Sequence, residues 1–176
     1  VSAGTMTKRK GFRDLIDAFS VARKLREMRL LILGDGYLRD ELPGQVNRLG
    51  LGQWVVMPGN VVNPLKYFSR ADVYALPSYS EGMPNVLVEA MMCGCTPVAY
   101  NCPTGPRELL NDGQIGYLVP LGDKDALARA LIDAVDSPVS SSVLDEAVDA
   151  FREEEVLKRH FMALGIPGGG TARSMT

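Results

Sequence analysis

Two carboxylates, Glu81 and Glu89, lie on either side of the point where a loop enters a helical pattern. The loop, residues 78–85, leaves an apolar run, and its Pro84 suits the first helical turn, where a missing N–H has no consequence. Free N–H groups and the positive dipole end of such a helix favour a phosphate. Carboxylates beside an anion site can accept hydrogen bonds from the hydroxyls of a sugar or ribose. The pattern equally allows Glu81 to be a solvated loop residue and Glu89 a surface residue of the helix.

Three other residue patterns could suggest a nucleotide or metal site, but each has a simpler explanation. Residues 34–36, Gly-Asp-Gly, begin like a dinucleotide fingerprint, but the third glycine is missing and they follow the second strand rather than the first. Residues 123–125 have D-x-D spacing, which binds metal in some transferases, but they open a helix that Asp123 is expected to cap. Cys93-x-Cys95 has no second ligand pair, and His160 stands alone, so no metal site is expected.

Short apolar runs alternate with segments of helical periodicity along the chain. Strands are expected at residues 1–3, 30–33, 55–57, 73–76, 97–99 and 117–119. Helices are expected from residue 64 and at residues 14–26, 38–49, 84–93, 123–135 and 142–164. Apolar strands separated by helices predict a doubly wound, Rossmann-like parallel sheet with helices on both faces. We expect this α/β domain over residues 1–164 and a disordered tail over residues 165–176.

The same periodicity predicts which side chains turn inward. In helix 14–26 these are Leu15, Ile16, Phe19, Ala22 and Leu25. The short helix from residue 64 is expected to turn Leu65 and Phe68 inward, and Pro43-Gly44 is expected to disturb helix 38–49. Doubly wound folds bind ligands at the carboxyl ends of their strands. The loops that matter are therefore 4–11, 34–39, 59–63, 78–85 and 101–107.

Composition limits the class of protein. The 176 residues suffice for one domain with a full hydrophobic core. A net charge of −2 does not favour nucleic acid or an anionic membrane as the main partner. Three cysteines, with no secretory signal, favour a reducing compartment. The abrupt opening at Val1 within a strand pattern, without an initiator Met, is expected of a fragment whose N-terminal part is missing.

Residues 81–98, EGMPNVLVEAMMCGCTPV, resemble the E-x7-E signature of the retaining glycosyltransferases of family four. The likeness is collinear, since Lys10-Gly11-Phe12 resembles the KG of the first loop, and residues 33–39 resemble the GDGPxR turn. Further similar segments are residues 58–61, 71–73, 77–78 and 116–120. Residues 1 to about 164 thus resemble the C-terminal, donor-binding domain of a two-domain GT-B enzyme. Residues 101–108 are similar to the form found in transferases that build bacterial capsule or lipopolysaccharide.

The resemblance implies a role for each matching position. Glu81 accepts hydrogen bonds from the donor sugar, Glu89 accepts from the ribose, and Lys10 neutralises the diphosphate; Glu81 and Lys10 are the catalytic candidates. The sugar and diphosphate lie near the backbone of Gly82, Met83, Pro84, Asn85 and Val86. The base is flanked by Gly34, Asn60 and Val61. The donor is then a nucleotide sugar, a UDP- or GDP-sugar, and neither a cofactor nor a metal is required.

The family usually has Arg where this chain has Thr5, which supplies no cation. Lys8, Arg9 or Arg13 could compensate, or each could be a solvated surface charge. The expected partners are the nucleotide sugar, a saccharide or lipid-linked acceptor and a missing N-terminal acceptor domain, with no nucleic acid. Membrane contact is expected only through the missing part. The expected location is cytoplasmic, with peripheral attachment to the inner face of the cell membrane left open.

The resulting functional hypothesis is the donor-binding domain of a hexosyltransferase. The whole protein moves a hexose from a nucleotide diphosphate to its acceptor with retention of anomeric configuration, and the isolated domain is expected to be inactive. One alternative is a nucleotide-sugar binding module without turnover. Another is a different GT-B enzyme, such as a phosphorylase or an epimerase.

Overall fold

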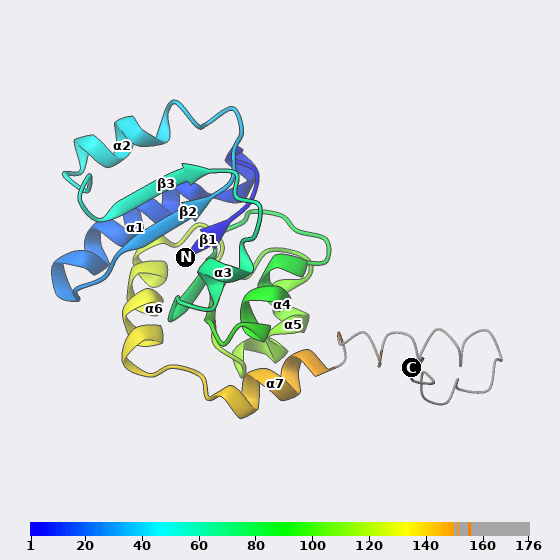
Figure 1. The fold of residues 1–176 in the computed structure, drawn as a ribbon. Coiled ribbons are helices and arrows are strands. Elements are labelled where there is room, and N and C mark those ends of the chain that lie inside the picture. Colours follow the sequence, from blue (N-terminus) through cyan, green and yellow to red (C-terminus); the bar gives the residue numbers. More distant parts are fainter. Residues whose placement is uncertain (150, 152–154, 156–176) are drawn as a thin grey trace.

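The computed structural model describes residues 1–149, 151 and 155, and it contains the predicted alternation of strands and helices (Figure 1). The strands are β1 Ser2–Ala3, β2 Leu30–Leu33, β3 Val55–Gly59, β4 Val73–Leu76, β5 Thr96–Tyr100 and β6 Tyr117–Val119. The helices are α1 Phe12–Leu25, α2 Leu42–Arg48, α3 Leu65–Phe68, α4 Asn85–Met92, α5 Pro106–Leu109, α6 Lys124–Asp136 and α7 Ser141–Asp149. Two 3-10 turns, η1 Lys8–Lys10 and η2 Asn111–Gly113, and helix α5 were not predicted.

The strands form two parallel three-stranded sheets, in the orders β1-β2-β3 and β4-β5-β6. Strands β1 and β4 adjoin, and the N–H of Ala75 donates to the carbonyl of Val1 at 2.9 Å. The prediction of a Rossmann-like parallel arrangement is confirmed, in the doubly wound order 3-2-1-4-5-6. Side chains also bridge the junction between the two sheets. The Ser2 hydroxyl donates to the carbonyl of Ala75 at 2.7 Å.

Helices cover both faces of the strands, and each face has its own core. Helices α1, α2 and α6 pack on one face, and α3, α4, α5 and α7 pack on the other (Figure 1). Strand β4 shows the division directly. Val73 and Ala75 belong to the first core, and Tyr74 and Leu76 to the second, as expected when side chains alternate across a strand.

Most predicted inward positions are buried, but two are not. Leu25 is 75% exposed and Leu65 is 44% exposed, because each lies at the end of its helix, beyond the packed stripe. Leu49 is also exposed, because α2 ends at Arg48. Pro43 does not disturb α2 but lies in its first turn, where proline is tolerated.

The C-terminal predictions have mixed outcomes. The side chain of Asp123 accepts from the N–H of Ala126 at 2.8 Å, so the predicted cap of α6 is confirmed. The predicted helix 142–164 is present as α7 up to Asp149. Its remainder lies largely outside the described residues, and His160 and the tail 165–176 lie entirely outside them. Among the described residues, no helix has the length and apolar character needed to cross a membrane.

Gly11 brings the loop after β1 against the end of β4, and this contact requires glycine. Its φ is +65°, and a Cβ atom there would lie 1.8 Å from the carbonyl oxygen of Pro77. Gly50 is a matched control, with φ +67° and nothing within 4 Å of the same position. We expect Gly50→Ala to lower the free energy of unfolding by about 1 kcal/mol and Gly11→Ala by roughly 3 kcal/mol or more. Urea denaturation measures both, and equal losses would contradict the close approach.

Candidate functional site

The loops that follow β1 and β4 meet where the strand order reverses, the usual ligand position in a doubly wound sheet. A pocket of about 350 Å³ lies there. Its walls come from the loop after β1, the loop after β4 and the first turn of α4. Lys10 and Glu81, 71 residues apart in the chain, project into it from the two loops.

Lys10 and Glu81 form an ion pair with 2.5 Å between Nζ and Oε1. The pair is largely withdrawn from solvent, since the Lys10 side chain is 13% exposed and the Glu81 side chain 8%. The guanidinium of Arg9 lies 4.0 Å from the other carboxylate oxygen and donates to the carbonyl of Ser80 at 2.9 Å. Two cations and one carboxylate leave this cluster with one net positive charge, which suits an anionic ligand.

Helix α4 adds a second source of positive potential. It begins at Asn85, directly after Pro84, and no side chain caps it. The N–H of Asn85 donates to the carbonyl of Met83 and that of Leu87 to the carbonyl of Pro84, so in the first turn the N–H of Val86 is the one left for a ligand. The helix dipole is positive at this end. An anion with several oxygens, such as a diphosphate, can accept from both the lysine and the helix start.

The loop after β5 holds the Glu81 loop from its other side, a role that the sequence did not predict. The hydroxyl of Thr104 donates to the carbonyl of Glu81. A Cβ atom on Gly105 would lie 2.4 Å from the carbonyl oxygen of Gly82, so the two loops touch through backbone. The only sequence signal was that residues 101–107 follow a strand on the same sheet edge.

The structure brings six of the predicted site residues into the pocket, namely Lys10, Glu81, Met83, Pro84, Asn85 and Val86. Glu89 is exposed on α4 about one turn beyond Asn85 and does not line the pocket. The other predicted positions lie outside the pocket walls. Gly82 and Asn60 are exposed, Val61 is half-buried, and Gly34 donates its N–H to the carbonyl of Gly59 at 2.9 Å.

The structure distinguishes the three cations, Lys8, Arg9 and Arg13, that could compensate for Thr5 at the position where the family usually has arginine. Thr5 lines the pocket and is exposed, so no cation stands at that position. Arg9 lines the pocket and approaches Glu81. Arg13 instead forms an ion pair with Glu41, and Lys8 does not line the pocket. Arg9 is the one of the three that can act in the pocket.

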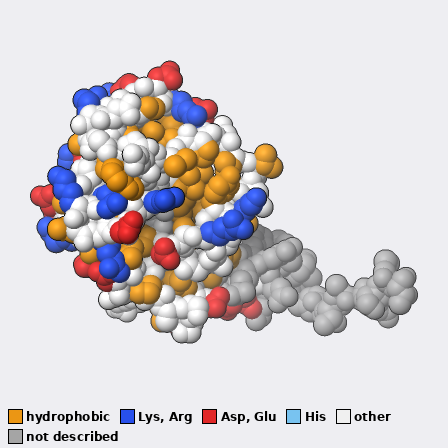
Figure 2. Space-filling view, turned by 60° about the vertical axis from the view of Figure 1, so that its left-hand side comes forward, with side chains coloured by type: hydrophobic (Ala, Val, Ile, Leu, Met, Phe, Trp, Pro, Cys, Tyr) orange, Lys and Arg blue, Asp and Glu red, His pale blue; other side chains and the backbone are white. Residues whose placement is uncertain are grey.

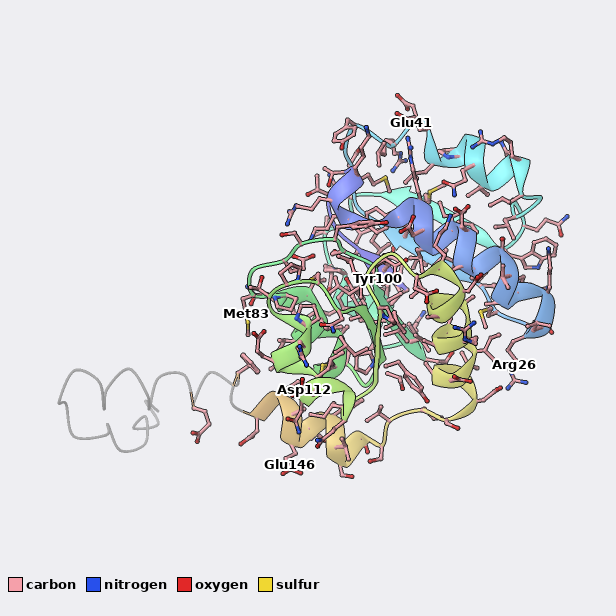
Figure 3. The ribbon with its side chains drawn as sticks, turned by 180° about the vertical axis from the view of Figure 1, so that it is seen from behind. Arg26, Glu41, Met83, Tyr100, Asp112 and Glu146 are labelled. Atoms are coloured by element: carbon pink, nitrogen blue, oxygen red, sulfur yellow. The ribbon has the colours of Figure 1, made fainter. Side chains whose placement is uncertain are left out.

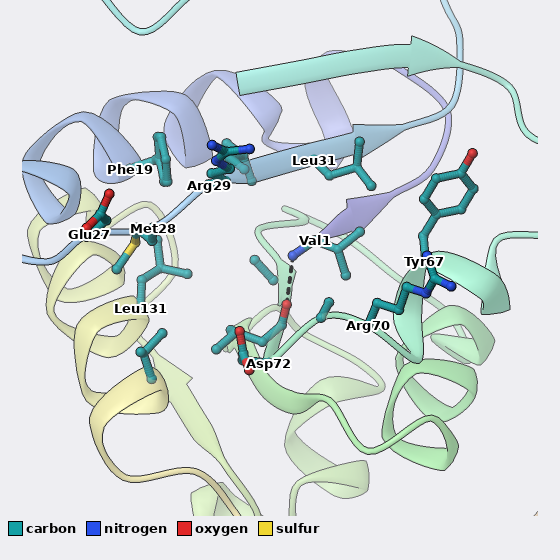
Figure 4. A pocket seen from close by; sticks show the side chains of 15 residues that line it. Val1, Phe19, Glu27, Met28, Arg29, Leu31, Tyr67, Arg70, Asp72 and Leu131 are labelled. Carbon is teal, nitrogen blue, oxygen red and sulfur yellow. Dashed lines mark hydrogen bonds between the residues drawn. The ribbon is translucent and has the colours of Figure 1, made fainter. Parts of the chain in front are cut away.

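A second cavity of about 350 Å³ lies at the opposite edge, at the amino ends of β1, β2 and β4 (Figure 4). Its floor is largely apolar and includes Leu31, Phe19 and Leu131. The amino group of Val1 donates to the carbonyl of Val73 at 2.7 Å in its wall. Because ligands of doubly wound folds bind at the carboxyl ends, this cavity is a weaker candidate than the pocket at Lys10.

The three cysteines are not placed for nucleophilic or metal chemistry. Burial raises the pKa of the Cys95 thiol to about 11, and burial also raises the pKa of Cys93 and Cys102. Protonated thiols are poor nucleophiles and poor metal ligands. No group of three His, Cys, Asp or Glu side chains among the described residues is arranged to hold a metal. Basic and acidic side chains are intermingled on the face in Figure 2, with hydrophobic ones between them.

Comparison with known proteins shows the family of this chain. Residues 1–151 match the family described as Glycosyl transferases group 1. The chain is 35% identical over 131 residues to N-acetylgalactosamine-N,N'-diacetylbacillosaminyl-diphospho-undecaprenol 4-alpha-N-acetylgalactosaminyltransferase of Campylobacter jejuni, covering 74% of this chain and 35% of that protein. It is 36% identical to the lipopolysaccharide core biosynthesis glycosyltransferase LpsE of Rhizobium meliloti, covering 74% and 37%. The chain thus matches about a third of the length of these relatives.

Solved structures share the fold. Alr3699/HepE of Anabaena, in complex with UDP and glucose, has a TM-score of 0.78 at 26% identity, covering 93% of this chain and 47% of that one. The pneumococcal O-GlcNAc transferase GtfA, in complex with UDP and GlcNAc, has a TM-score of 0.84 at 23% identity, covering 93% and 34%. This chain therefore belongs to the glycosyl transferases of group 1 and has the Rossmann-like fold of one half of a GT-B enzyme.

Proposed function

We propose that this chain is the donor-binding domain of a hexosyltransferase that uses a UDP- or GDP-sugar and retains anomeric configuration. The main observation that supports this proposal is the buried Lys10–Glu81 pair beside the start of α4, which has no side-chain cap. The acceptor is a saccharide or a lipid-linked saccharide, held by a further domain. The support for this acceptor class is that the Campylobacter relative is named for a diphospho-undecaprenol substrate.

Each pocket group has one task in the proposed reaction. When the sugar leaves, negative charge builds on the diphosphate, and Lys10 and the N–H of Val86 at the start of α4 stabilise that charge as preorganised donors. Glu81 accepts hydrogen bonds from hydroxyls of the sugar and so orients it. Arg9 supplies the second cation in place of the one that Thr5 lacks.

The nucleoside lies further along the sheet edge in this proposal. Glu89, exposed on the same helix, accepts from the ribose hydroxyls, and the base lies between Gly34 and the segment Asn60-Val61. No metal takes part, because two cationic side chains and a helix start already face the diphosphate. We place the reaction in the cytoplasm, with any membrane contact made by other parts of the protein.

The ion pair makes the two glutamates distinguishable by calorimetry. Glu81→Gln releases Lys10 and removes a negative charge, so UDP is expected to bind about 1 kcal/mol more tightly. UDP-glucose also loses the hydrogen bonds between its sugar and Glu81, so its affinity is expected to rise less than that of UDP. Glu89→Gln, the matched control on the neighbouring helix α4, is expected to weaken the binding of both ligands alike because ribose is common to both.

The wild-type chain should bind UDP with an affinity of about −5 to −6 kcal/mol, in the high micromolar range. Absence of any heat with UDP, GDP or their sugars at millimolar concentration would sink the proposed function. Equal changes for both ligands in both variants would overturn the assigned roles while leaving donor binding intact.

A further inference from the structure

A carboxylate outside the pocket connects three elements around it. One oxygen of Asp14, on the first turn of α1, accepts from the hydroxyl of Tyr79 at 2.5 Å and from that of Tyr100 at 3.3 Å. Tyr100 ends β5 and is completely buried, in the centre of the molecule in Figure 3. Tyr79 belongs to the loop after β4 and lies two residues before Glu81. Asp14 thus joins the helix that follows Lys10 to the loop that carries Glu81.

The backbone around Tyr79 is fixed to the turn η1, just before α1. Its N–H donates to the carbonyl of Arg9 at 2.8 Å, and the Arg9 guanidinium returns a bond to the carbonyl of Ser80 at 2.9 Å. The ring of Tyr79 packs edge-on against the ring of Tyr100, with 5.9 Å between centroids. These contacts leave little freedom between residue 79 and the carboxylate of Glu81.

The hydroxyl bond is not needed to fill the core. Tyr79 is 40% exposed, so loss of its hydroxyl opens no cavity, and its ring keeps the contact with Tyr100. The hydrogen bond to Asp14 raises the pKa of Tyr79 to about 12, so the group remains a donor at physiological pH. A bond that adds little packing and lies beside the pocket is suited to setting the position of a loop.

We propose that Asp14 is a positioning residue, which holds the Tyr79 hydroxyl and thereby fixes the carboxylate of Glu81 against Lys10 and the donor sugar. This inference rests on the proposed function, because it is tested through the affinity for the donor sugar. A purely structural role of Asp14 would change the melting temperature and would change the binding of UDP and of UDP-glucose equally. A positioning role changes the ratio of the two affinities, since only UDP-glucose carries the group that Glu81 contacts.

The experiment compares Tyr79→Phe with Tyr100→Phe, the matched control that removes the other hydroxyl from the same carboxylate. Calorimetry of the chain with UDP and with UDP-glucose gives the affinity ratio. We expect the ratio to fall about tenfold in Tyr79→Phe, which corresponds to 1.4 kcal/mol, and to stay unchanged in Tyr100→Phe. Asp14→Ala should lower the affinity ratio as much as Tyr79→Phe does, and the double variant Asp14→Ala/Tyr79→Phe should lower it no further. Asp14→Asn should restore part of the ratio, because its amide oxygen can still accept from the Tyr79 hydroxyl.

Amide hydrogen exchange on the ligand-free variants separates this inference from the proposed function. Faster exchange at residues 80–82 in Tyr79→Phe, but not in Tyr100→Phe, is the expected result. If the wild-type chain binds neither ligand, the proposed function fails, and exchange still decides whether Asp14 holds the loop. Unchanged exchange, or the same affinity ratio in Tyr79→Phe as in the wild type, overturns the positioning role.

Discussion

Lys10→Ala is expected to weaken the binding of UDP by about 1.5–3 kcal/mol, the scale of a hydrogen bond to a charged group. Lys10 is the most enclosed cation of the pocket, and its ammonium already lies at the meeting point of the two loops. Arg9 is half-exposed and 4.0 Å from Glu81, so it replaces only part of the lost attraction. Calorimetry with UDP measures the loss.

The same substitution also affects stability. It leaves the carboxylate of Glu81, 8% exposed, without its main partner, and an orphaned buried charge of this kind destabilises by about 3 kcal/mol. Lys124→Ala is the control, because Lys124 and Asp17 form an exposed pair at 2.9 Å, for which less than about 1 kcal/mol is expected. The double variant Lys10→Met/Glu81→Gln should recover stability without recovering UDP binding. Similar losses of unfolding free energy in Lys10→Ala and Lys124→Ala would show that the Lys10–Glu81 pair contributes no more than an exposed ion pair.

The sequence predicted the framework because the framework depends on period and polarity. Four-residue apolar runs such as Leu30–Leu33 and Val73–Leu76 became parallel strands, and the loops at their carboxyl ends came together as that fold class requires. The resemblance supplied the identity of Lys10 and Glu81. That both project into one pocket follows from the adjacency of β1 and β4, which the doubly wound order implies.

The contacts within the site were not predictable from periodicity. The bond of Thr104 to Glu81 joins two loops, and the bond of Tyr79 to Asp14 joins a loop to α1. The paths of these loops are set by left-handed glycines and backbone contacts, which leave no repeating signal in the sequence. The prediction that Leu25 and Leu65 turn inward was wrong for a related reason. Periodicity describes an endless helix, whereas burial depends on where each helix ends against its neighbours.

Residues 1–176 alone are expected to bind the donor but to transfer no sugar to an acceptor. Several groups around the donor pocket remain open to solvent in the described part of the chain, including Thr5, Met83 and Asn85. Figure 3 shows Met83 at the edge of the molecule. Holding donor and acceptor together contributes about 7–11 kcal/mol to lowering a barrier, and a pocket open on one side does not hold the second substrate.

The assay follows radiolabelled UDP-sugar with saccharide and lipid-linked acceptors and counts free sugar separately from acceptor product. Water reaches an exposed donor more readily than an acceptor does, so slow hydrolysis is the expected product. Glu81→Gln should abolish this hydrolysis if the pocket is responsible, and a full-length relative with its own substrates serves as the positive control. Acceptor product that forms with the wild-type chain and disappears with Glu81→Gln would show that the pocket described here needs no further domain for transfer.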